Sequence, residues 1–113
     1  TNHDEQTVMG VQVSTAVGLL NRFIREIDDN DLFIKVVQLK TLAERGVITY
    51  IAKRLQRIHK DLLRVGSKRM THDEALAEII EMAKKYAPYY TAQESLLNEQ
   101  ETEAEIILSE SFN

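Results

Sequence analysis

The chain has 113 residues, of which 43% are hydrophobic and 28% are charged, and its formal net charge is −4. This length is enough for one domain with its own hydrophobic core. The sequence contains no cysteine, which excludes disulfides, thiolate metal ligands and thiol nucleophiles. We expect a single helical domain over residues 1–113, with an N-terminal tail at 1–6 and an acidic C-terminal segment at 99–113.

The first residues, TNHDEQT, are polar and acidic. A signal peptide would have a basic start followed by an apolar run, and a membrane-spanning helix would need about 20 consecutive apolar residues. Neither pattern occurs in the sequence. We therefore expect a cytoplasmic protein that makes no membrane contact.

The first predicted helix carries apolar residues at three- and four-residue spacing from Val13 to Ile27. It starts at residue 7 or at residue 12, because VMGVQV could also form a short strand. The acidic stretch DDND at 28–31 ends the pattern. Asn30 or Asp31 is then a suitable N-cap for the next helix.

The second apolar pattern runs from Leu32 to Val65 and keeps one helix face in register. A continuous helix of this length would measure about 51 Å, whereas a compact domain of this size has a radius of gyration of about 13 Å. Either Gly46 breaks the helix into a hairpin, or the helix is continuous and buries its overhang in a second subunit. The unbroken register favours the continuous helix and a homodimer. Its seam would consist of Val36, Leu39, Val47, Ile51, Leu55, Ile58 and Leu62.

The remaining third of the chain carries several helix-end signals. GSK at 66–68 predicts a turn, and THDE at 71–74 predicts a capping box that opens a helix ending at Pro88. TAQE at 91–94 predicts a second capping box. Beyond Asn98 two alternatives stay open, namely one helix to Leu108 or an acidic linker with an apolar end. The expected fold is all-α, a dimeric bundle of three to four helices with one long central helix.

No catalytic motif occurs in the sequence, neither a glycine-rich phosphate loop nor a nucleophile elbow nor a zinc-binding histidine pair. His72, Asp73 and Glu74 are metal-ligand types, but adjacent helical positions diverge by about 100° and cannot converge on one ion. We therefore predict no enzyme, no catalytic residues, no cofactor and no metal.

The stretch KRLQRIHKDLLRVGSKR at 53–69, called here the basic stretch, holds seven of the 14 Lys and Arg residues and one Asp. On a continuous helix most of these charges would lie within about 80° of one another, opposite the apolar face. Like charges at three- and four-residue spacing destabilise a helix, so the pattern indicates an anionic partner. The predicted contact residues are Lys53, Arg54, Arg57, Lys60, Arg64, Lys68 and Arg69.

Carboxylates and phosphates are both candidate anions. The acidic stripe Glu74, Glu78 and Glu81 would point away from the basic stretch if the two helices pack by their apolar faces, whereas a second subunit or the acidic C-terminal segment could reach it. Nucleic acid is disfavoured by ten acidic residues against two lysines from residue 70 onward. A helix-turn-helix interpretation of residues 39–58 departs from the usual pattern, because Ala43 and Gly46 stand one residue too close.

These patterns predict a small non-enzymatic regulatory or adaptor protein that acts through protein–protein contacts of a helical bundle. The alternative is a nucleic-acid-binding accessory protein that places the basic stretch on phosphates.

Overall fold

The computed structural model describes the backbone of residues 2–112 and the side chains of residues 10–111. It contains four α-helices, α1 (Asn2–Ile24), α2 (Asn30–Arg45), α3 (Thr49–Leu63) and α4 (His72–Phe112), and no strand within the described residues. The predicted all-α fold is confirmed, and the four helices pack against each other.

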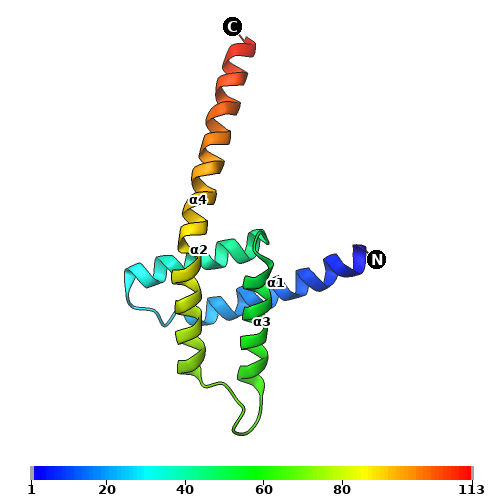
Figure 1. The fold of residues 1–113 in the computed structure, drawn as a ribbon, viewed down its shortest axis with the longest axis vertical. Helices are drawn as coiled ribbons and strands as arrows, with labels where there is room; N and C mark the ends of the chain where they lie inside the picture. The colour runs from blue at the N-terminus through cyan, green and yellow to red at the C-terminus, as the bar shows by residue number, and fades with distance from the viewer. Residues whose placement is uncertain (1, 113) are drawn as a thin grey trace.

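α1 and α2 run across the direction of α3 and α4 (Figure 1). α1 packs against α2 and α3, and α2 packs most extensively against the first part of α4. The second part of α4 projects alone, which gives the molecule extents of 69 × 42 × 19 Å. The radius of gyration is 17.7 Å, against about 13 Å for a compact domain of this length. The projecting part of α4 contributes to this elongation.

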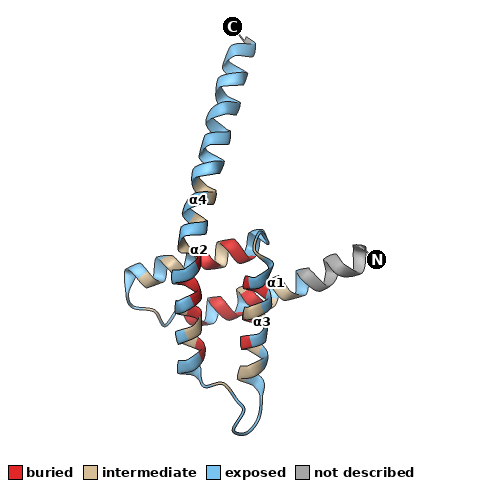
Figure 2. Ribbon diagram, in the orientation of Figure 1, coloured by how far each residue is buried: buried red, intermediate tan, exposed pale blue. Residues whose placement is uncertain are grey.

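The core is built from apolar residues of all four helices, and it contains no buried polar side chain among the described residues. Figure 2 shows the buried positions gathered where the four helices meet. The fully or almost fully buried residues are Ala16, Leu19, Leu20, Phe23, Val36, Leu39, Leu42, Ala43, Ile51, Ala52, Leu55, Ile58, Ala75, Ile79, Met82, Ala83 and Tyr86.

The predicted continuous helix over 32–65 is wrong, because the chain turns at Gly46. This residue has φ 66° and ψ 17°, a left-handed conformation that glycine adopts without steric cost. Its N–H lies 3.2 Å from the carbonyl oxygens of both Leu42 and Ala43 and closes α2. α3 starts at Thr49, so only three residues join the two helices. The apolar register stays unbroken because both helices present their apolar faces to the same core.

The residues of the predicted seam lie in this structure within the core of one chain. Five of them are at most 1% exposed, which leaves no surface for a second subunit to contact. Leu62 is partly buried against the same core, and Val47 is 59% exposed in the turn. The physical reason is the break at Gly46, which folds the two halves of the seam inward. The five buried residues are Val36, Leu39, Ile51, Leu55 and Ile58.

The helix ends differ in detail from the predicted ones. α1 is helical from Asn2, where a tail was expected at 1–6, and it ends at Ile24 rather than at residue 27; Thr1 lies outside the described residues. Asp29, and neither Asn30 nor Asp31, caps α2 by accepting a 3.0 Å hydrogen bond from the backbone N–H of Leu32. An acceptor one residue earlier suffices because it still reaches the third N–H of the helix.

The capping box at the start of α4 is confirmed. The backbone N–H of Thr71 donates to the Glu74 carboxylate at 3.3 Å, and the backbone N–H of Glu74 donates to the Thr71 hydroxyl at 3.2 Å. The turn predicted at 66–68 is also present, with Gly66 at φ 87°. Gly66 does not cap α3, however, because that helix already ends at Leu63 and Arg64 is extended.

The predicted helix end at Pro88 and the second capping box at 91–94 are both wrong. α4 continues through Pro88 to Phe112, which settles the two alternatives for the C-terminal segment in favour of one helix. The hydroxyl of Thr91 donates to the carbonyl of Ala87 at 3.3 Å within the helix instead of capping a new one. Proline removes one hydrogen bond from a helix, and contacts with the body hold α4 on both sides of it.

Candidate interaction surfaces

The structure divides the basic stretch between a helix and a loop. Lys53, Arg57 and Lys60 lie within about 60° of one another on the exposed side of α3. Arg64 follows the helix in an extended conformation. Lys68 and Arg69 lie in the loop between α3 and α4, so they do not continue the predicted one-sided stripe.

Arginines of the basic stretch are partly neutralised within the chain. Arg54 lies on the side of α3 that faces α4 and forms a partly buried ion pair with Glu78. The expectation that the basic and acidic stripes point away from each other is therefore wrong at this position. Asp61 lies between Arg57 and Arg64, with its carboxylate 3.6 Å and 3.1 Å from their Nε atoms.

The lysines of the basic stretch differ from Arg54, Arg57 and Arg64 in their ion pairing. Among the described residues, no carboxylate lies within ion-pair distance of Lys53, Lys60 or Lys68. All three are exposed. The charge that is open to a partner therefore comes from these lysines, from the guanidinium of Arg57, whose side chain is 59% exposed, and from the exposed Arg69, which donates to a carbonyl.

A cavity of about 460 Å³ opens beside the loop between α3 and α4. Arg22 of α1 and Arg69 of the loop line it together with apolar side chains of Leu62 and Leu63. The Nε atom of Arg69 donates to the carbonyl of Leu62 at 3.0 Å, which fixes one side of this wall. Arg22 lies outside the basic stretch, so the cavity adds one more positive charge to this end of the molecule.

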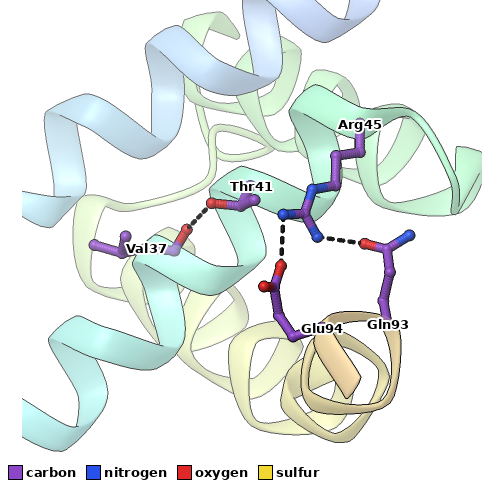
Figure 3. A network of polar contacts seen from close by, with 5 residues as sticks. All are labelled: Val37, Thr41, Arg45, Gln93 and Glu94. Carbon is purple, nitrogen blue, oxygen red and sulfur yellow. Dashed lines mark hydrogen bonds and ion pairs between the residues drawn. The ribbon is translucent and has the colours of Figure 1, made fainter. Parts of the chain in front are cut away.

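The last contact of α4 with the body is a polar clamp (Figure 3). Arg45, at the end of α2, donates to the side chains of Gln93 and Glu94, both at 2.6 Å. Its guanidinium also lies 5.6 Å from the centre of the Tyr90 ring. The sequence suggested a capping role for Glu94, whereas its carboxylate binds Arg45 and fixes the direction in which α4 leaves the body.

Residues 95–111, called here the arm, are exposed without exception (Figure 2). The arm contains five glutamates and no Lys or Arg. Five of its six apolar residues fall within about 120° around the helix and form the apolar stripe of the arm, whereas Ile106, which is 52% exposed, lies outside this sector. The stripe consists of Leu96, Leu97, Ala104, Ile107 and Leu108, of which the four larger residues are 39–62% exposed.

The apolar stripe of the arm was not predicted, although its residues have helical spacing in the sequence. Leu97, Ala104 and Ile107 are separated by seven and three residues, a spacing typical of one helix face. The glutamates between them obscured the pattern. The sequence also left open whether residues beyond Asn98 form a helix or an acidic linker.

Within the described residues, no group of three or more His, Asp and Glu side chains could hold a metal ion. None of the described helices combines the length and the apolar composition that crossing a bilayer requires. Comparisons with protein-family models, with curated proteins and with solved structures found no match to this chain.

Proposed function

We propose that the chain is a small non-enzymatic regulatory or adaptor protein that binds another protein through the arm. The observation that carries the proposal is the exposed apolar stripe on a helix that leaves the body. Most helical stability in proteins comes from the packing of an apolar face against a partner. The arm has 17 residues and no packing partner within the described part of the chain.

The chemistry of the arm defines its partner. Burying an exposed leucine or isoleucine contributes about 1.5–3 kcal/mol, and the stripe offers four such side chains. An amphipathic helix of this kind fits an apolar groove on another protein. Because every charge on the arm is negative, the rim of that groove should carry Lys or Arg.

Photo-crosslinking in the cells that make the protein tests this function. A photoreactive amino acid at Gln100, within the apolar stripe, is expected to give a covalent adduct with a different protein that mass spectrometry can identify. The matched control is Thr102, which is equally polar and exposed but lies on the opposite side of the helix. Adducts of equal yield at both positions, or none at Gln100, would show that the arm does not dock another protein.

Nucleic-acid binding is a second candidate function, and one observation favours it. α2 and α3 are joined by three residues with a left-handed glycine, as in helix-turn-helix units, and α3 carries the exposed Lys53, Arg57 and Lys60. The acidic arm leaves the body at the end opposite the loop between α3 and α4 (Figure 1). It is therefore directed away from the lysines that would contact phosphates.

Titration of fluorescent duplex and single-stranded oligonucleotides at about 50 and about 200 mM salt tests this candidate. If it is correct, affinity falls steeply with salt, and the variant Lys53→Glu with Lys60→Glu does not bind. The control is Arg25→Glu with Lys35→Glu, which changes the net charge equally at exposed or half-exposed sites on α2 and the preceding loop. Absence of binding at the lower salt concentration would exclude the candidate.

A further inference from the structure

The arm has a regular order of side-chain types along its length. Leu96 and Leu97 lie at its start, and Ile107 and Leu108 lie near its end. Between them come four glutamates, of which Glu101 and Glu103 lie on either side of the apolar stripe. The arm therefore presents an apolar, an acidic and a second apolar segment.

The exposed side of α3 presents the complementary order. Tyr50 near its start is 53% exposed, with its ring 6.5 Å from that of Tyr86 in α4, and Leu63 at its end is 67% exposed about 140° away around the helix. Between them lie Lys53 and Lys60, which have no carboxylate partner among the described residues, and Arg57. Val65, just beyond the helix, is 95% exposed and extends the second apolar segment.

The dimensions of the two surfaces also agree. The 17 residues of the arm span about 26 Å, and the 15 residues of α3 span about 23 Å. Leu97 and Ile107 are about 15 Å apart along the helix axis, and Tyr50 and Leu63 are about 20 Å apart. The difference is less than one helical turn of about 5.4 Å, so the two surfaces agree in length along the helix axis.

The arm of the same chain cannot occupy this surface. α4 is one continuous helix, and its arm projects beyond the body, away from the loop at the end of α3 (Figure 1). Two arms are also unsuited to each other, because each carries five glutamates and no basic residue, and like charges placed side by side oppose association. A second copy can supply an arm to α3 without either obstacle.

We infer that two copies form an antiparallel dimer in which the arm of each lies along the exposed side of α3 of the other. A two-fold axis across the long dimension places the body of one copy beside the arm of its partner, so the same contact occurs twice. The inference rests on the proposed docking role of the arm. It states that the arm binds α3 of a second copy when no other protein is present. A different protein that binds the arm then competes with the second copy.

Light scattering of the purified chain and of charge-reversed variants, at matched micromolar concentrations, tests the dimer. The unchanged chain is expected at twice the 13.0 kDa of one chain. Lys53→Glu with Lys60→Glu should shift the mass to that of a monomer, and so should Glu101→Lys with Glu103→Lys. Mixing the two variants should restore the dimer, because each arm then meets an α3 of opposite charge. Arg25→Glu with Lys35→Glu should remain dimeric.

Three results would overturn the inference. The first is a monomeric unchanged chain, and the second is an assembly larger than a dimer. The third is a dimer that survives reversal of Lys53 and Lys60, since this would mean that the dimer does not form through α3. The measurement uses the purified chain alone, so its failure leaves the adaptor function untouched. Likewise, the absence of a foreign adduct in the crosslinking experiment would leave the dimer standing.

Discussion

Replacing Phe23 with alanine is expected to lower the free energy of unfolding by about 3–5 kcal/mol. The Phe23 side chain is 0% exposed and is the largest fully buried side chain among residues 10–111. Its ring stacks on His72 at 4.7 Å between ring centres, so it joins the end of α1 to the start of α4. Typical domains are stable by only about 5–15 kcal/mol, so the loss would be a large fraction of the total.

Urea denaturation followed by circular dichroism at a fixed protein concentration measures this loss. Phe33→Ala is the matched control, because the same side chain is 40% exposed on α2 and its removal leaves no buried cavity. The control should cost about 1 kcal/mol or less. Equal losses for the two variants would mean that the core does not centre on Phe23.

The core follows directly from periodicity, which explains why most of the fold was predictable. Ala16, Leu20 and Phe23 lie on one face of a helix in the sequence, and the structure buries all three. The capping box of Thr71 and Glu74 was equally predictable, because it depends only on side chains within one turn.

The break at Gly46 was harder to predict, because the sequence allows two folds with the same apolar register. A helix interior tolerates glycine at a cost of about 1 kcal/mol, so its presence does not decide between a kinked rod and a turn. The decision comes from tertiary packing, since the turn places Val36 and Leu55 in one core. Periodicity describes a face but not what that face contacts.

The charged surfaces were only half predictable for the same reason. The position of Lys53 and Lys60 on one side of a helix follows from spacing, and the structure exposes both. The ion pair of Arg54 with Glu78 depends on how α3 and α4 are placed side by side, which spacing does not describe. The clamp of Arg45 on Glu94 joins residues 49 positions apart and left no local signal.

Replacing Pro88 with alanine is expected to raise the free energy of unfolding by about 2–2.6 kcal/mol. Proline in a helix interior costs about 3 kcal/mol relative to alanine, and its restriction of the unfolded chain returns about 0.4–1 kcal/mol of this. Pro88 is exposed, so the substitution removes no buried contact. The new backbone N–H at position 88 can donate to the carbonyl of Lys84 and complete the helix between body and arm.

Pro88→Gly separates this effect from a simple loss of the proline ring. Glycine also restores the N–H but costs about 1 kcal/mol relative to alanine in a helix, so its gain should be smaller than that of Pro88→Ala. Thermal and urea unfolding of the three proteins measure the order. If α4 instead ended at Pro88, the alanine variant would show no gain in the free energy of unfolding, because its N–H would have no helical carbonyl to donate to. The arm would then have no fixed direction, and the match between its apolar segments and those of α3 would lose its geometric basis.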